Sequence, residues 1–181
     1  YAGEHGLWCK GLPCFAGAYH VPAVIRWPKG IRRPGRVEEA YIHLGDFAPT
    51  FLEAAGIRVE RSFAGRSLLP FLRDEAPSDW RTEHYTQSNG NELYGIQRSV
   101  ADRRWKYVYN GFDFDEMYDL HSDPQEMRNL IDEPGYEAVI RKMSRKIWRF
   151  AREHGDVCIN PYIMVGLAEH GPGVAFAEEE E

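Results

Sequence analysis

The chain has 181 residues, of which 43% are hydrophobic and 28% charged, and its net charge is −6 at neutral pH. This composition is typical of a globular protein with a buried core and excludes a wholly disordered chain. Four glutamates at the end of the sequence supply four of the excess negative charges, so the remainder is only mildly acidic. We therefore expect no general affinity for nucleic acid or for an anionic membrane.

Targeting signals are not evident in the sequence. No apolar run reaches the roughly 18 residues that a membrane-spanning helix needs. Residues 1–5 contain no Met, no basic segment and no apolar stretch, so we expect a processed or truncated end rather than a signal peptide. The three cysteines, Cys9, Cys14 and Cys158, form no disulfide framework, which favours a reducing compartment such as the cytoplasm and leaves the localisation unknown.

The first half of the chain predicts one strand, one helix and several loops. Residues 21–27 are expected to form a short buried strand between turn-forming prolines. A helix is predicted over 46–56, where Asp46 can cap the first turn and Gly56 can end the last in a left-handed conformation. Residues 65–72 predict a turn followed by a short apolar segment.

The residue composition of the chain changes after an acidic, proline-containing linker at 74–80. Short runs rich in aromatic and β-branched residues alternate with turn residues, which predicts a small antiparallel meander. Its strands are expected at 81–86, 93–101, 105–110 and 117–120. Asp123 followed by Glu126 resembles a capping box and predicts the start of a short helix.

The strongest helical pattern lies at 135–153, where apolar residues recur every three or four positions. The opposite face of this predicted helix carries six basic residues: Arg141, Lys142, Arg145, Lys146, Arg149 and Arg152. We interpret the segment as a docked helix with a solvated basic face rather than as a nucleic-acid surface. The tail at 157–181 shows little periodicity and is expected to be extended and to pack on a partner.

Near its start the chain concentrates reactive residue types in EHGLWCKG, residues 4–11, and three generic chemistries are open there. Thiolates and imidazoles suit zinc, although their spacing matches no common zinc finger. The candidate zinc ligands are His5, Cys9, Cys14 and His20. A catalytic thiol is disfavoured, because no local feature would lower the pKa of a cysteine. Glycines around Lys10 would let the backbone approach an oxyanion that the ammonium binds.

Five phrases together resemble the C-terminal portion of a type I sulfatase of the alkaline-phosphatase-like superfamily. They occur in the family's order and spacing across residues 3–132: GEHGLWCKG, HVPAVIRWPKGI, GDFAPTFLEAAGI, GRSLLPFL and KYVYNGFDFDEMYDLHSDPQEMRNL. The resemblance implies an α/β fold in which residues 1–78 end the large catalytic domain. Residues 79–156 would form a subdomain with a four-stranded antiparallel sheet and a helix, followed by the extended tail at 157–181.

The resemblance also implies a sulfuric ester hydrolase that cleaves a sulfate ester or sulfamate of a sugar or small molecule. In this family a formylglycine, made from the Cys or Ser of a C/S-x-P-x-R motif, attacks sulfur while Ca²⁺ polarises the sulfate. The motif is absent from this sequence, and the family's metal ligands are expected upstream of Tyr1. We therefore expect the isolated chain to be inactive and its first partner to be the N-terminal part of the same enzyme.

Within the matching phrase, Lys10 corresponds to the family's sulfate-binding lysine. Its ammonium would stabilise the charge that gathers on the ester oxygen as the S–O bond breaks. His5 belongs to the same phrase and is expected to orient its neighbours rather than to contact substrate. Substrate selection is expected from the loop at 87–91. The candidate residues for that role are His84, Gln87, Asn89 and Asn91.

Two other functions stay open at this point. A phosphonate or phosphodiester hydrolase of the same superfamily would bind a similar tetrahedral anion. A truncated, non-catalytic module would only pack or bind, and a truncated sheet predicts an exposed apolar patch near residues 21–27. The substrate and the oligomeric state, including a homo-oligomer, are left open by the sequence.

Overall fold

The computed structural model describes residues 1–8, 10–11, 13–58, 60–90, 95–111, 113–157, 166 and 168–176. Contacts divide the chain into two compact units, one of Tyr1–Val21 with Tyr85–Glu181 and one of Pro22–His84. The first residues of the chain therefore belong with the sheet that follows more than sixty residues later. The domain boundaries expected from the family resemblance stay a prediction, because the units are defined by contacts alone.

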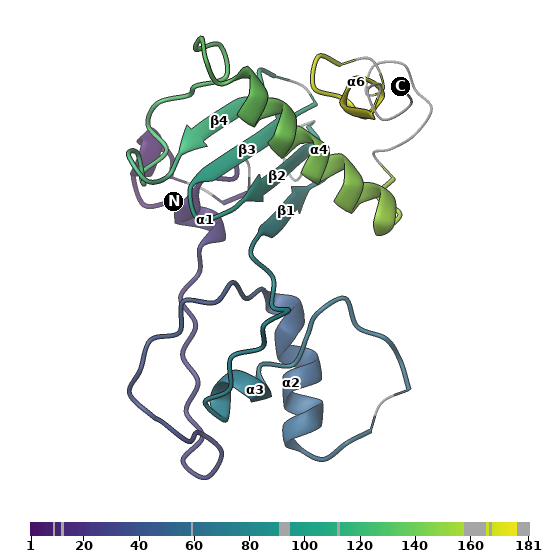
Figure 1. Ribbon diagram of the computed structural model, residues 1–181. Coiled ribbons are helices and arrows are strands. Elements are labelled where there is room, and N and C mark those ends of the chain that lie inside the picture. Colours follow the sequence, from purple (N-terminus) through teal and green to yellow (C-terminus); the bar gives the residue numbers. More distant parts are fainter. Residues whose placement is uncertain are drawn as a thin grey trace. The chain divides into compact units, whose positions relative to one another are not determined.

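A four-stranded antiparallel sheet forms the centre of the first unit, and its strand order β1-β2-β3-β4 follows the chain (Figure 1). The strands are β1 (His84–Ser88), β2 (Gln97–Ala101), β3 (Trp105–Asn110) and β4 (Glu116–Asp119). In the register, Tyr107 of β3 lies opposite Val100 of β2 and Met117 of β4. The predicted meander is confirmed, with bounds that differ by a few residues in β1, β2 and β4.

One face of the sheet is apolar and packs against α4 (Glu137–Glu153), which lies across it in Figure 1. Side chains alternate between the faces of a strand, so Val100, Tyr107 and Met117 point to this face together. The helix covers them with Ile140, Met143, Ile147, Trp148 and Ala151. Complete burial of side chains of this size contributes about 1.5–3 kcal/mol each, so this layer is the core of the unit. The helix predicted at 135–153 is confirmed.

A second helix, α6 (Pro172–Phe176), packs beside α4. The Trp148 indole donates a hydrogen bond to the His170 carbonyl at 2.6 Å, and Arg145 Nε donates to the Ala175 carbonyl at 2.7 Å. The prediction of an extended tail is therefore wrong for 172–176. Burial of Ala175 and these bonds from α4 stabilise a short helix that sequence periodicity does not reveal.

The opposite face of the sheet is polar and is covered by the N-terminal segment of the chain. Lys106 Nζ donates to the Cys14 carbonyl at 2.5 Å and lies 2.8 Å from Glu126 Oε2. Both charged side chains are almost completely buried, at 6% and 4% exposure. The Phe15 and Tyr118 rings pack edge to face, with ring centroids 6.2 Å apart. A buried ion pair and an aromatic contact therefore fix residues 14–16 on the sheet.

The helix predicted to begin at Asp123 is wrong, because the segment forms turns instead. Glu126 adopts a left-handed backbone with φ +59°, which an α-helix does not accommodate. Its carboxylate faces Lys106 and also accepts a hydrogen bond from the Ala16 backbone N–H at 3.3 Å. The local capping pattern is overridden by this tertiary ion pair.

In its described residues, the second unit contains the short helical segments η2 (Leu44–Asp46), α2 (Phe47–Ala54) and α3 (Leu69–Leu72). The predicted helix at 46–56 is confirmed as α2, and the apolar segment at 65–72 ends in α3. The sequence suggested that the Asp46 side chain caps α2, but it makes no cap hydrogen bond there. The carboxylate accepts from the backbone N–H groups of His43 at 2.9 Å and Arg66 at 2.8 Å, and it forms a two-pronged ion pair with Arg81.

The buried strand predicted at 21–27 is wrong. The segment has no strand assignment, and Val24 is 93% exposed. A strand requires a neighbouring strand for its backbone hydrogen bonds, and none is paired with this segment in the residues that the structure describes. Exposed Val21 and Val24 agree with the expectation of apolar surface here. Within the described residues, no helix combines the length and apolar character needed to cross a membrane.

Removal of the Lys106 ammonium should destabilise the protein, because it leaves a buried carboxylate without its cation. In Lys106→Met the Glu126 carboxylate keeps its charge but loses its cation, so we expect the free energy of unfolding to fall by about 3–5 kcal/mol. Denaturant unfolding followed by circular dichroism measures this change. The double variant Lys106→Met/Glu126→Gln should recover part of the loss. A double variant that is less stable than the single one would contradict the interpretation.

The Asp46 cluster predicts a pH dependence of stability. Burial alone would raise the pKa of Asp46, but the Arg81 guanidinium and two backbone N–H groups hold its pKa below the ordinary value. The resulting stabilisation is complete above the unfolded-state pKa of about 3.9 and is lost as pH falls through the lower folded-state pKa. Asp46→Asn should be less stable at neutral pH and lose less stability on acidification. The free energy of unfolding of both proteins is measured with urea at several acidic pH values. An equal decrease in both proteins as the pH is lowered would refute the prediction.

Candidate functional site

The N-terminal loop, residues 3–11, is shaped by several residues with a left-handed backbone. Gly3, Gly6 and Gly11 have φ angles of +106°, +72° and +96°, which residues with a Cβ adopt only at a cost. The short turn η1 (Glu4–Gly6) is closed by hydrogen bonds from Gly3 N–H to the Leu7 carbonyl and from Leu7 N–H to the Glu4 carbonyl, both 2.9 Å. The glycines therefore fix a compact loop conformation.

Phe15 anchors this loop to the sheet. The His5 ring stacks flat on the Phe15 ring, with centroids 3.7 Å apart and an interplanar angle of 4°. Tyr1 adds a second contact to this segment. Its hydroxyl donates a hydrogen bond to the Pro13 carbonyl and accepts one from Phe15 N–H at 3.2 Å. The orienting role expected for His5 stays a prediction. A short helix, α1 (Ala16–Tyr19), follows the anchor.

Lys10 lies on the exposed side of the anchored loop. No hydrogen bond or ion pair holds its ammonium within the part of the chain that the structure describes, which leaves out the neighbouring Cys9 and Leu12. Trp8, two residues away, is 80% exposed, and a Cβ atom at Gly3 would lie 3.4 Å from its ring. The loop thus presents a compact positive charge and an exposed indole from a fixed backbone.

The other chemistries considered for this segment are not supported by the described residues. The Cys14 thiol is buried, which raises its pKa despite the nearby Lys106, so it does not exist as a nucleophilic thiolate at neutral pH. His5 stacks on Phe15 and His20 is exposed, while Cys9 lies outside the described residues. No cluster of three or more metal-ligating side chains is found where the structure describes the chain.

The predicted substrate-selection residues that the structure describes lie in β1 and directly after it. His84 begins the strand, with its ring 5.4 Å from that of Tyr41, and the Gln87 side chain is exposed. Asn89 is exposed as a residue, but its side-chain oxygen accepts a hydrogen bond from Arg98 at 2.8 Å. Asn91 lies outside the described residues. Their role in substrate selection stays a prediction.

Arg98 is a buried anchor for the end of β1 that sequence reasoning missed. Its guanidinium makes a two-pronged ion pair with Asp156, at 2.6 and 2.9 Å, just beyond the end of α4. The same guanidinium donates to the Ser88 carbonyl at 2.9 Å and to Asn89. It therefore ties the end of β1 to the end of α4. Asp156 is 58 residues away, so no local pattern reveals the pair.

The described residues do not fit the Ca²⁺ site that the resemblance implies. Ca²⁺ takes six to eight oxygen ligands, usually with several carboxylates, and no suitable cluster occurs here. Among the described residues, the most buried carboxylate is that of Asp46, and it already accepts hydrogen bonds from Arg81 and from backbone N–H groups. No step that involves a metal ion is derived from this chain.

Comparison with known proteins identifies the family of the segment that contains the loop and the sheet. A family model described as "N-sulphoglucosamine sulphohydrolase, C-terminal" matches residues 3–153. The chain belongs to this sulfatase C-terminal family. The matched range begins at Gly3 in the anchored loop and ends with the last residue of α4, so it includes both the exposed lysine and the complete sheet.

Two curated relatives and one solved structure illustrate the similarity. The "Multifunctional alkaline phosphatase superfamily protein PehA" of Trinickia caryophylli is 33% identical over 88% of this chain and 34% of its own length. The "N-acetylglucosamine-6-O-sulfatase" of Bacteroides thetaiotaomicron is 32% identical over 86% of this chain and 29% of its own. A solved complex with the substrate D-glucosamine-2-N,6-O-disulfate aligns with a TM-score of 0.71 and 27% identity, covering 87% and 33%.

These findings confirm the sulfatase resemblance and the α/β fold class with its small antiparallel sheet and packed helix. The chain spans about a third of the length of the curated relatives it matches.

Burial of Cys14 predicts selective protection from alkylating reagents. In a Cys9→Ser/Cys158→Ser background, the folded chain should react with iodoacetamide far more slowly than the denatured chain, because the thiol is buried and its pKa is raised. Mass spectrometry at successive times follows the reaction. Rapid modification of Cys14 in the folded chain would show that this thiol is accessible and ionised.

Proposed function

We propose that this chain is the C-terminal part of a sulfuric ester hydrolase that cleaves a sulfate ester or sulfamate of a sugar. The observation that carries the proposal is the Lys10 ammonium, exposed on a glycine-shaped loop within the matched family range. Phe15, held against Tyr118, gives the loop a firm base, so the backbone that carries Lys10 has a defined position. A positioned charge is more effective in catalysis than a mobile one.

Lys10 would act on the sulfuryl group as its bond to the ester oxygen breaks. The sulfuryl group passes to an acceptor oxygen, while the ester oxygen leaves with the bonding electron pair and takes up a proton. Negative charge grows on the leaving oxygen during this step. A lysine ammonium is a compact charge with three donors, which suits the oxygens of a tetrahedral anion. It would bind one of these oxygens and stabilise the developing charge.

The nucleophile and the metal site of this enzyme would be supplied by residues outside the chain. The sequence has no C/S-x-P-x-R motif from which formylglycine could form, and the described residues form no Ca²⁺ site. Formylglycine would supply the nucleophile and Ca²⁺ would polarise the sulfate. This chain would contribute the Lys10 contact and the residues at the end of β1, and by itself it would hydrolyse nothing.

A sulfated amino sugar is the substrate class that best fits the relatives. One relative is named an N-acetylglucosamine-6-O-sulfatase, and the solved complex contains glucosamine disulfate. The end of β1 offers two exposed amide residues, Gln87 in the strand and Asn89 just after it, whose side chains can hydrogen-bond to sugar hydroxyls. Arg98 bonds to Ser88 and Asn89, so the position of the Asn89 amide would be set before substrate binds.

Hydrolysis of a phosphate or phosphonate ester is the second candidate. The observation that favours it is similarity to a protein named as a multifunctional member of the alkaline phosphatase superfamily. An ammonium binds the oxygens of either tetrahedral anion, so Lys10 alone does not separate the two. The ratio of kcat/KM for an aryl sulfate and the matching aryl phosphonate does, and the main proposal predicts preference for the sulfate.

Lys10→Ala in the enzyme that includes the N-terminal part tests the main proposal. Loss of one positioned charge-stabilising group should lower kcat/KM for a sulfate ester by roughly 100- to 1,000-fold. Lys29→Ala is the matched control, since it removes an exposed lysine from the other unit. Near-normal activity of Lys10→Ala, or turnover by the chain without the N-terminal part, would overturn the proposal.

A further inference from the structure

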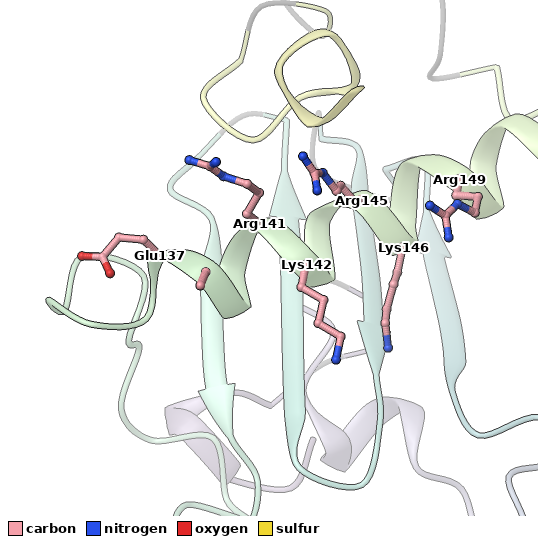
Figure 2. Close-up of a pocket in the computed structure, with 7 residues that line it drawn as sticks. Glu137, Arg141, Lys142, Arg145, Lys146 and Arg149 are labelled. Carbon is pink, nitrogen blue, oxygen red and sulfur yellow. The ribbon is translucent and has the colours of Figure 1, made fainter. Parts of the chain in front are cut away.

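An open hollow of about 650 Å³ lies on the outer face of α4, and charged side chains that line it belong to the fold (Figure 2). Arg145 Nε donates a hydrogen bond to the Ala175 carbonyl at 2.7 Å, and Lys146 lies 3.7 Å from the Asp102 carboxylate. These contacts connect α4 to α6 and to the segment between β2 and β3, so we assign no ligand to the hollow.

Two asparagine–glycine pairs, Asn89-Gly90 and Asn110-Gly111, carry a chemistry that the proposed function does not use. Asparagine before glycine can lose its side-chain amide spontaneously, because the next backbone nitrogen can attack the side-chain carbon Cγ. Glycine has no Cβ to hinder this approach. The two dipeptides are identical in sequence, so any difference between them comes from the structure.

Hydrogen bonds protect Asn110 from this reaction. The residue is only 7% exposed, and its side-chain nitrogen donates to Glu116 Oε1 at 2.9 Å. Its side-chain oxygen accepts from Gln97 Nε2 at 2.6 Å. The attacking nitrogen is engaged as well, because Gly111 N–H donates to the Ile96 carbonyl at 2.9 Å. The side chain and the nitrogen would both have to be released before a bond could form between them.

Asn89 has a different environment directly after the end of β1. The residue is exposed, and Gly90 has a left-handed backbone with φ +78°. Within the described part of the chain, no hydrogen bond engages the side-chain nitrogen of Asn89 or the backbone N–H of Gly90. The side-chain oxygen accepts from Arg98 Nη2 at 2.8 Å. Solvent can therefore reach the amide, and the nitrogen that must leave is not held.

We propose that Asn89 is a site of spontaneous deamidation that converts the residue to aspartate and isoaspartate. The Gly90 nitrogen gives its proton to hydroxide from solvent and forms a bond to Cγ of Asn89. The bond from Cγ to the side-chain nitrogen breaks, and that nitrogen leaves as ammonia. Water then opens the resulting five-membered succinimide ring at either carbonyl, which yields aspartate or isoaspartate.

Arg98 promotes the first step of this reaction. Negative charge gathers on the side-chain oxygen of Asn89 as the Gly90 nitrogen attacks, and this is the atom to which Arg98 donates. A positioned cation stabilises such charge. Asp156 holds the guanidinium in place, with distances of 2.6 and 2.9 Å from its carboxylate oxygens. The contact engages only the oxygen, so it leaves both Cγ and the leaving nitrogen available.

The two pairs in one chain give the test an internal control. The folded chain and the chain in guanidinium chloride are incubated at mildly alkaline pH, and mass spectrometry of proteolytic peptides follows both sites. In denaturant the sites should react at similar rates. In the folded chain Asn110 should react at least about tenfold more slowly than Asn89, because its hydrogen bonds must break first. Equal rates at the two sites in the folded chain would overturn the proposal.

The role of Arg98 is tested in Arg98→Met/Asp156→Asn, which removes both charges of the buried pair together. Deamidation of Asn89 should slow by about tenfold when the charged donor is lost. Continued protection of Asn110 reports in the same sample that the sheet is folded. An unchanged rate at Asn89 in the folded double variant would overturn the role of Arg98. Asn89→Gln, whose longer side chain disfavours ring closure, should reduce isoaspartate in the folded chain to background.

Deamidation would also alter substrate selection, a consequence that rests on the proposed function. The product places a carboxylate where the Asn89 amide would meet a sulfated sugar. In the enzyme with its N-terminal part, Asn89→Asp should raise KM for that sugar by about threefold with little change in kcat, because the new charge repels sulfate. An unchanged KM would overturn this consequence alone, because deamidation is measured by mass without turnover.

Discussion

The buried ion pair between Lys106 and Glu126 connects the sheet to the loop that carries the candidate site. Its desolvation is costly, and the cost is offset because Lys106 also donates to the Cys14 carbonyl and Glu126 also accepts from Ala16 N–H. The pair thereby holds residues 14–16 against the polar face of the sheet. Phe15 then supports the His5 ring, and the loop ending at Gly11 extends from that support.

The two faces of the sheet consequently have different structural roles, one in stability and the other in positioning the loop. The apolar face and α4 supply the hydrophobic burial that makes the unit stable. The polar face fixes the N-terminal loop through an ion pair and an aromatic contact, so the position of Lys10 depends on directional contacts more than on burial. This division lets a small sheet serve as a platform for a residue that precedes it in the chain by more than seventy positions.

Local patterns in the sequence predicted the parts of the structure that local physics determines. The period of α4 and the turn residues between the strands were sufficient for the helix and the meander. The five phrases predicted the family, which the matched model confirms. The role of Lys10 in sulfate binding was predicted from the same resemblance and stays a prediction.

The failures all involve partners that lie far away in the sequence. Glu126 looked like a helix start but pairs with Lys106, and residues 21–27 looked like a strand but have no described strand beside them. Asp46 looked like a helix cap but binds Arg66 and Arg81, which follow it by 20 and 35 residues. A local pattern cannot identify a side chain that tertiary contacts have engaged.

The most direct test is a double-mutant cycle between Lys10 and Lys106, measured as kcat/KM for a sulfate ester in the enzyme that includes the N-terminal part. The assay is run at a temperature at which circular dichroism shows all four proteins folded. If Lys106 acts by positioning the loop, Lys106→Met lowers kcat/KM in the parent enzyme but changes it little in the Lys10→Ala background. An equal loss in both backgrounds would show that the ion pair does not act through Lys10 and would contradict the account.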